Sequence, residues 1–210
     1  MGDEYGTVKV AAVQAASVFL DREASVEKAC RLIREAGQNG ARIIGFPEGF
    51  IPAHPVWYHH HAATGAVANK LAVELFKNSV EIPGPQTEAL GRAARDANAY
   101  VVMGVCEKLP NTTGTMFNTQ VYFGPDGSII RKHQKIMPTV GERLVHMGGY
   151  GDTFGAFQSE FGPMSGLICG ENSNPLAVFA LIAEGTRMDV EAVCAMADVH
   201  ADDGAVGVTA

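Results

Sequence analysis

The sequence predicts a layered α/β fold in one compact domain. Short apolar segments with strand character alternate with segments whose apolar residues recur at helical spacing. The chain has 210 residues, of which 47% are hydrophobic and 19% charged, and this is enough to build one core without disulfides. We find no linker, internal repeat or low-complexity stretch that would divide the chain.

The first half of the chain predicts two strands and three helices. The first strand is expected over Val8–Ala15, which is rich in valine and alanine. Asp21 is a good N-cap, and apolar residues then recur at helical spacing until Gly37. A buried strand over Ala41–Phe46 ends at Pro47 and Glu48. The two remaining helices flank a turn-forming Pro-Gly-Pro and are expected near Leu71–Val80 and Gln86–Ala97.

The second half predicts four strands and one helix. The strands are expected over Tyr100–Glu107, Phe117–Phe123, Ser128–Lys132 and Ser165–Cys169. Gly124–Gly127 reads Gly-Pro-Asp-Gly, which is typical of a tight turn, so a hairpin joins the second and third of these strands. The last helix is expected near Pro175–Glu184, directly behind the last strand.

Charge and composition exclude several kinds of partner. A net charge of −7 without a cluster of lysine and arginine argues against binding to nucleic acid, which needs a basic surface. We see no leader sequence and no apolar run long enough to cross a bilayer, so we expect a soluble, cytoplasmic protein without a membrane partner. Cys30, Cys106 and Cys194 lack the spacing of a zinc site and are interpreted as reduced thiols.

Cys169 is the best candidate for a nucleophile. It ends a short apolar segment and is followed by small and polar residues, so we expect a strand, a sharp turn and then a helix. Such a turn exposes the thiol, and backbone N–H groups such as that of Gly170 can stabilise a developing negative charge. A free cysteine on its own is more often a buried apolar filler. The assignment therefore depends on its neighbours.

Glu48 and Lys135 are the polar residues that we expect to accompany Cys169, because all three stand where apolar strands end. Glu48 follows an apolar run, and this suits its carboxylate to accept and return protons. Lys135 precedes Ile136 and Met137, and its ammonium can stabilise a transition-state anion. Only a few per cent of a free thiol is ionised at neutral pH, so a nearby base and cation would activate it.

Five segments of the chain, in order, resemble the nitrilase superfamily of carbon-nitrogen hydrolases and most closely its nitrilase branch. The segments are Val8–Ala15, Phe46–Phe50, Arg131–Thr139, Gly141–Leu144 and Gly166–Asn172. The resemblance covers about residues 7–187. It implies an α-β-β-α sandwich, no metal or organic cofactor, and assembly into homo-oligomers.

The resemblance also implies the roles of individual residues. Glu48, Lys135 and Cys169 would form a catalytic triad, and Glu142 would help to position the reacting groups. The Gly170 N–H would serve as an oxyanion donor. At this position the family often has tryptophan, so the glycine removes a bulky wall and can alter substrate preference.

The reaction implied by the resemblance is hydrolysis of a small nitrile by water to a carboxylic acid and ammonia, through a thioimidate and a thioester on Cys169. The first alternative is an amidase, which uses the same triad on an amide. The second is an inactive, truncated relative that acts only in assembly. The sequence Lys-His-Gln-Lys-Ile-Met-Pro-Thr, followed by Gly-Glu-Arg, is more similar to nitrilases than to amidases.

The C-terminal part of the chain departs from the family. Members continue through further strands and helices beyond the nucleophile helix, whereas this chain stops at Ala210. We expect an incomplete carbon-nitrogen hydrolase domain over residues 1–187 and a divergent tail over residues 188–210. The chain would then be a fragment or a product with an altered C-terminal reading frame.

Two further features carry weaker interpretations. His54 and the adjacent His59, His60 and His61 are typical of a loop near a pocket, because three adjacent histidines cannot all face one ion. We therefore predict no metal site. Trp57 and Asn172 are candidate substrate-binding residues, although ordinary packing explains a tryptophan equally well.

Overall fold

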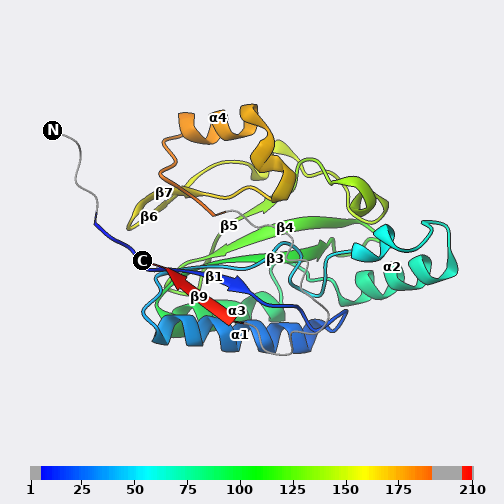
Figure 1. The fold of residues 1–210 in the computed structure, drawn as a ribbon, viewed down its shortest axis with the longest axis horizontal. Coiled ribbons are helices and arrows are strands. Elements are labelled where there is room, and N and C mark those ends of the chain that lie inside the picture. Colours follow the sequence, from blue (N-terminus) through cyan, green and yellow to red (C-terminus); the bar gives the residue numbers. More distant parts are fainter. Residues whose placement is uncertain (1–5, 191–204, 210) are drawn as a thin grey trace.

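The computed structural model describes residues 6–190 and 205–209, and their layers follow the order α-β-β-α (Figure 1). One helical layer covers one face of a six-stranded sheet, and a three-stranded sheet and the last helix lie over the other face. The helices are α1 (Arg22–Gln38), α2 (Ala66–Asn78), α3 (Pro85–Ala97) and α4 (Pro175–Ala183). The predicted α/β class and the expected sandwich are confirmed.

The large sheet has the strand order β5-β4-β3-β2-β1-β9. Its strands are β1 (Val10–Gln14), β2 (Ile43–Gly45), β3 (Tyr100–Lys108), β4 (Met116–Phe123), β5 (Ile129–Gln134) and β9 (Ala205–Thr209). The strands β1, β2 and β3 are parallel, whereas β4 and β5 continue as antiparallel hairpins and β9 is antiparallel to β1. Consequently, the end of β2 and the end of β5 can contribute side chains to one region across β3 and β4.

The main core lies between the large sheet and the pair α1 and α3. α1 begins where predicted, since the Asp21 side chain accepts a hydrogen bond from the Ala24 N–H at 2.9 Å. Its apolar face is fully buried at Ala29, Leu32 and Ile33. These residues pack with buried side chains of β2, β3 and β4. Burial of this stripe, more than helix propensity, stabilises the helix.

A second core joins the two sheets. The small sheet has the order β6-β7-β8, formed by β6 (Phe157–Ser159), β7 (Gly162–Ser165) and β8 (Met188–Asp189). Phe157 and Met164 pack against Tyr122 and Val102 on the face of the large sheet that is opposite to α1 and α3. This contact holds the segment after β7 close to β4 and β5.

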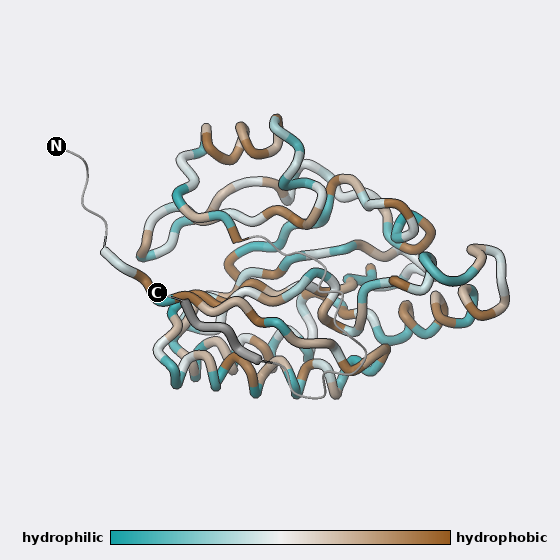
Figure 2. The backbone as a smooth tube through the Cα atoms, viewed as in Figure 1, coloured by the Kyte–Doolittle hydropathy of each residue, from teal (hydrophilic) through white to brown (hydrophobic). Residues whose placement is uncertain are grey.

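α4 lies on the outside of the small sheet and leaves apolar side chains in solvent. The exposed residues are Leu176, Phe179 and Ile182, and much of the helix has hydrophobic colours in Figure 2. Only Leu181 of this helix is buried. A contiguous exposed apolar face of this kind is typical of an interaction surface.

The most important correction concerns the segment that carries Cys169. The predicted strand over Ser165–Cys169 is wrong, because β7 ends at Ser165 and Cys169 begins a short 3₁₀ helix, η4 (Cys169–Ser173). The extended segment between them is held by side chains of β4, since the Tyr122 hydroxyl donates to the Gly166 carbonyl at 3.2 Å. Side-chain contacts from β4 therefore help to shape this segment.

Smaller differences concern element ends. α2 begins at Ala66, before the predicted start near Leu71, and β5 continues past Lys132 to Gln134. The strands β6 and β8 were not expected from the sequence. The predicted turn at Gly124–Gly127 is confirmed by a hydrogen bond from the Gly127 N–H to the Gly124 carbonyl.

The structure describes only part of the predicted divergent tail over residues 188–210. β8 and β9 belong to it, whereas residues 191–204 and 210, which include Cys194, lie outside the described residues. The boundary at residue 188 stays a prediction. No helix among the described residues is both long and apolar enough to cross a membrane.

Candidate active site

The segment after β2 places Glu48 against β3. The Phe46 N–H donates to the Val102 carbonyl at 2.9 Å, and the Ile51 N–H donates to the Gly104 carbonyl at 3.2 Å. Between these two anchors the chain passes so close to β3 that a Cβ on Gly104 would lie 2.1 Å from the Pro47 oxygen. A glycine at this position therefore permits the approach that buries Glu48, which is 3% exposed.

β5 places Lys135 beside β4. The Lys135 N–H donates to the Asn118 carbonyl at 2.8 Å, and the Lys135 carbonyl accepts from the Gly149 N–H at 2.7 Å. The side chain is 1% exposed, which is unusual for a lysine unless it has charged partners. Those partners come from two other segments of the chain.

Lys135 Nζ donates to two buried carboxylates. Its distances are 2.6 Å to Glu48 Oε1 and 3.1 Å to Glu142 Oε2. The Asn118 side chain adds a third contact, because its Nδ2 donates to the same Glu48 oxygen at 2.6 Å. We call these four residues, Glu48, Asn118, Lys135 and Glu142, the lysine cluster. The sequence predicted three of its members, and the structure brings them together.

The charges of the lysine cluster do not balance, because two carboxylates share one ammonium. Burial lowers the pKa of Lys135, but Glu48 and Glu142 raise it above its usual value, so it is an ammonium at neutral pH. Burial raises the pKa of Glu142, the ammonium of Lys135 lowers it and Glu48 raises it, with a net shift upward. The site therefore favours uptake of a proton.

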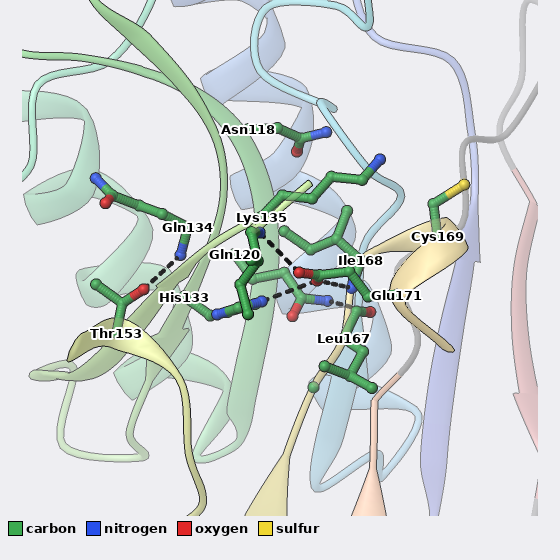
Figure 3. Close-up of polar contacts among 12 residues, drawn as sticks. Asn118, Gln120, His133, Gln134, Lys135, Thr153, Leu167, Ile168, Cys169 and Glu171 are labelled. Carbon is green, nitrogen blue, oxygen red and sulfur yellow. Dashed lines mark hydrogen bonds and ion pairs between the residues drawn. The ribbon is translucent and has the colours of Figure 1, made fainter. Parts of the chain in front are cut away.

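Cys169 lies on the turn where η4 begins, with its sulfur directed away from the buried Glu171 carboxylate (Figure 3). Its backbone is left-handed, with φ of 52°, which is uncommon for a residue other than glycine. Burial and the Glu48 carboxylate raise the pKa of the thiol, while Lys135 and a hydrogen bond from the Gly170 N–H lower it. The net shift is upward, so the thiol is protonated at neutral pH.

This electrostatic arrangement determines what the site can do. A protonated thiol must lose its proton as it attacks, and Glu48, which is close enough to influence the thiol directly, can accept it. Lys135 and the Gly170 N–H are the groups that favour the anionic sulfur. The site can therefore form a covalent bond from Cys169 to an electrophilic carbon and stabilise negative charge beside it.

Asn118 is a member of the site that the sequence did not reveal. It lies within β4, in which every residue is buried. Its Oδ1 has no partner among the described residues, so the side chain has capacity for a further hydrogen bond. The sequence does contain a signal for this residue. Three consecutive polar residues, Asn118, Thr119 and Gln120, lie in a fully buried strand, and buried polar groups require hydrogen-bond partners.

His54 is a second neighbour of the lysine cluster. Its Nε2 lies 3.6 Å from Glu142 Oε2, and burial lowers its pKa, so the imidazole is neutral at pH 7. His146 is also buried, and burial, with His54 and Lys135, lowers its pKa to about 3. Ligating atoms of Glu48, His54 and Glu142 lie within 4.8 Å of one another. Lys135 already supplies a cation between the two carboxylates, so we treat His54 as a neighbour of the lysine cluster and propose no metal ion at this group.

Trp57 and Asn172 are placed in packed or turn-forming environments. Trp57 belongs to an apolar cluster with Leu75 and Met116 and is 4% exposed. Asn172 Nδ2 donates to the Cys169 carbonyl at 3.1 Å and to the Leu167 carbonyl at 3.3 Å. These contacts account for Asn172, whereas the buried Trp57 Nε1 has no hydrogen-bond partner among the described residues. Contact of either side chain with a substrate stays a prediction. The three adjacent histidines, His59–His61, are exposed.

The chain is similar in sequence to one known family. The model of the family described as carbon-nitrogen hydrolase matches residues 9–204. A nitrilase of Bacillus sp. (strain OxB-1) is 39% identical over 186 residues, which cover 89% of this chain and 53% of the relative. Nitrilase 3 of Arabidopsis thaliana is 36% identical over 197 residues, covering 92% of this chain and 55% of the relative. The chain thus spans about half the length of these relatives.

Solved structures agree on the fold. A carbon-nitrogen hydrolase from Helicobacter pylori G27 has a TM-score of 0.69 at 16% identity, with coverage of 89% of this chain and 60% of that one. An amidase from Nesterenkonia sp. has a TM-score of 0.67 at 18% identity, with coverage of 92% and 67%. At these identities the likeness concerns the fold alone.

Proposed function

The chain belongs to the carbon-nitrogen hydrolase family, and we propose on that premise that it hydrolyses a nitrile to a carboxylic acid and ammonia. Cys169 is the nucleophile, Glu48 the general base, and Lys135 the fixed cation. Glu142 holds Lys135 in place. The observation that carries the proposal is the 2.6 Å contact of Lys135 Nζ with Glu48 Oε1, next to a thiol whose pKa both groups influence.

In the first step, Glu48 removes the thiol proton while the sulfur of Cys169 forms a bond to the nitrile carbon. Electrons of the carbon-nitrogen bond move to the nitrogen, which takes up a proton, and the product is a thioimidate. Lys135 and the Gly170 N–H stabilise the charge that develops during this step. Both groups already favour negative charge at the sulfur.

In the later steps, Glu48 activates one water molecule, which adds to the thioimidate carbon, and ammonia leaves to give a thioester. A second water molecule hydrolyses the thioester and returns the proton to the Cys169 sulfur. The sum is one nitrile and two waters converted to one acid and one ammonia. All proton transfers in this scheme use protein side chains and water, and we propose no metal or organic cofactor.

We propose a nitrile, and not an amide, as the substrate because the relatives with the higher sequence identities are nitrilases. The nitrilase from Bacillus and an aliphatic nitrilase of Sinorhizobium fredii (strain HH103) are each 39% identical to this chain. The amidase from Nesterenkonia is only 18% identical. Amide hydrolysis by the same residues is therefore the alternative outcome in the following experiment.

The test is ammonia release from a panel of aliphatic, aromatic and arylacetic nitriles and of the corresponding amides. Wild type, Cys169→Ala and Glu48→Gln are compared, with the exposed Glu88→Gln as the matched control for loss of a carboxylate. We expect nitrile turnover by wild type and Glu88→Gln and none by the other two. Turnover of amides alone would support the amidase. If folded wild type releases no ammonia from any nitrile or amide, the result would support the second alternative, an inactive relative that acts only in assembly.

We also propose that the protein forms homo-oligomers through α4. Leu176, Phe179 and Ile182 are 77%, 67% and 61% exposed, and a second copy would remove this apolar surface from water. Light scattering should show that Phe179→Ser shifts the protein toward the monomer. Val73→Ser on α2, which removes a 52% exposed apolar side chain elsewhere, is the control.

A cytoplasmic location is proposed from the cysteines. Cys30, Cys106 and Cys169 are free thiols among the described residues, and the reaction requires Cys169 in its reduced form. A reducing compartment preserves such a thiol.

A further inference from the structure

Glu171 is a buried carboxylate that the proposed reaction does not use. It lies within η4, is 7% exposed, and accepts three hydrogen bonds (Figure 3). Its Oε1 accepts from the Ile136 N–H at 2.8 Å. Its Oε2 lies 2.9 Å from the Ile168 nitrogen and 2.8 Å from His133 Nε2. Because a carboxylate only accepts, His133 contributes its Nε2–H.

The donors of these hydrogen bonds lie next to the reacting groups. Ile168 directly precedes Cys169, and Ile136 directly follows Lys135. One carboxylate therefore connects the turn that carries the thiol to the end of the strand that carries the ammonium. Ile136 and Glu171 are 35 residues apart in sequence, and the two segments follow strands of different sheets.

The connection stabilises a backbone that would not persist alone. Cys169 has a φ of 52°, and a residue other than glycine retains such a conformation only when its surroundings determine it. The Glu171 carboxylate fixes the residue before Cys169, and the Glu171 N–H donates to the Ile168 carbonyl at 3.2 Å, which closes the turn. The two contacts hold the two peptide units on either side of the Ile168 Cα, directly before Cys169.

The carboxylate is ionised when it makes these contacts. Burial raises the pKa of Glu171, but hydrogen bonds from His133, Ile136 and Ile168 lower it below its usual range. Burial, with the Glu171 charge among the further causes, raises the pKa of Tyr122 of β4 and of Asp189 of β8. Charge-assisted hydrogen bonds of this kind are shorter and stronger than neutral ones.

We infer that Glu171 is a positioning residue that fixes Cys169 relative to Lys135 by clamping the turn before the thiol to the end of β5. The inference rests on the proposed function, in which Cys169 and Lys135 act on the same substrate. Glu171 acts through backbone N–H groups and through His133 and touches neither the sulfur nor Lys135 Nζ. Misplacement of a reacting group by about 1 Å can cost on the order of 100-fold in rate.

The test is Glu171→Gln in the full chain. The amide keeps the shape of the side chain but loses the charge and one acceptor oxygen, so at least one donor is left without its partner. Glu184→Gln is the matched control, because the Glu184 carboxylate also accepts a backbone N–H, that of Ala156 at 2.7 Å, but lies at the end of α4. Folding is checked by circular dichroism and thermal unfolding.

Two readouts are compared. The first is the alkylation rate of Cys169 by iodoacetamide across a pH range, followed by mass spectrometry of the peptide that carries it. The second is kcat and KM on the nitrile that wild type turns over. For Glu171→Gln we expect a changed alkylation profile and a kcat about 10- to 100-fold lower, with KM within about twofold. Glu184→Gln should match wild type on both readouts.

A folded Glu171→Gln with the wild-type alkylation profile and kcat would overturn the inference. If this variant does not fold, His133→Phe is used to test the inference. It keeps a ring in contact with Phe154 and removes the hydrogen bond from His133 to Glu171. An altered alkylation profile in folded His133→Phe supports the clamp, and an unaltered one overturns it. If wild type turns over no substrate, the proposed function fails, while the alkylation comparison still decides the role of Glu171.

Discussion

The Lys135 ammonium lies 2.6 Å from Glu48 Oε1 in a site where both side chains are almost fully buried. Glu142 shares the same ammonium at 3.1 Å, so the region holds more negative than positive charge. Burial and this excess of negative charge together raise the pKa of Glu142 and of the Cys169 thiol. The thiol is therefore unreactive until a base removes its proton.

Loss of the shared cation should destabilise the fold. Lys135→Met leaves two buried carboxylates without their ion-pair partner, and breaking a buried ion pair costs about 3–5 kcal/mol. Urea unfolding monitored by circular dichroism measures the change in unfolding free energy. Lys77→Met is the control, because its 2.8 Å ion pair with Glu74 is exposed and should change stability by less than about 1 kcal/mol. Equal effects of the two substitutions would contradict the role of the buried pair.

Removal of the base should make the thiol more acidic while it abolishes turnover. The Glu48 carboxylate raises the pKa of Cys169, so Glu48→Gln should shift the pH profile of Cys169 alkylation to lower pH. The same variant should lose about 10²- to 10⁴-fold in kcat because the thiol proton has no acceptor. Glu88→Gln should leave the profile unchanged. An alkylation profile that moves to higher pH in Glu48→Gln would show that Glu48 does not act on the thiol.

Acid should weaken the fold through Glu171. Its pKa is lower in the folded state than in the unfolded chain, so its contribution to stability is fully present above the unfolded carboxyl pKa of about 4.3. That contribution is lost as the pH falls through the lower folded-state pKa. Unfolding free energies of wild type and Glu171→Gln should differ by about 1.5–3 kcal/mol near pH 7 and converge in acid. A difference that does not depend on pH would contradict the shift.

The close approach at Gly104 should be intolerant of a methyl group. In Gly104→Ala the new Cβ would lie 2.1 Å from the Pro47 oxygen and 2.9 Å from the Gly49 nitrogen, and both are backbone atoms. We expect a loss of about 1–3 kcal/mol and displacement of Glu48, with little remaining turnover. Gly114→Ala, where a Cβ would have no neighbour within 4 Å, should fold and turn over normally. Thermal unfolding and ammonia release measure both variants.

The parts of the structure that could be predicted are those determined by local pattern. Asp21 begins α1 as an N-cap, and the helical spacing of apolar residues gives the face that packs on the sheet. Glu48 and Lys135 were found because each follows an apolar strand and such strand ends meet at one edge of a sheet. Family resemblance added Glu142, whose position in the short 3₁₀ helix η2 (Val140–Leu144) no periodicity indicates.

Features set by distant contacts could not be predicted. The turn at Cys169 reads as a strand in sequence, but side chains of β4 and the Glu171 carboxylate determine its shape. Asn118 joins the lysine cluster through pairing of β4 with its neighbours, which a single strand sequence does not reveal. His54 reaches Glu142 across two loops. In each case at least one of the deciding partners is far away in the chain.

Mass spectrometry of the covalent intermediate tests the central claim most directly. Wild type is mixed with a nitrile that it turns over, quenched in acid and digested, and the peptides that carry cysteine are analysed. We predict an adduct with the mass of the acyl or imidoyl group on Cys169 and none on Cys30 or Cys106, and Cys169→Ala should release no ammonia. Ammonia release by folded Cys169→Ala at the wild-type rate, or an adduct on another residue, would contradict the assignment of Cys169 as the nucleophile.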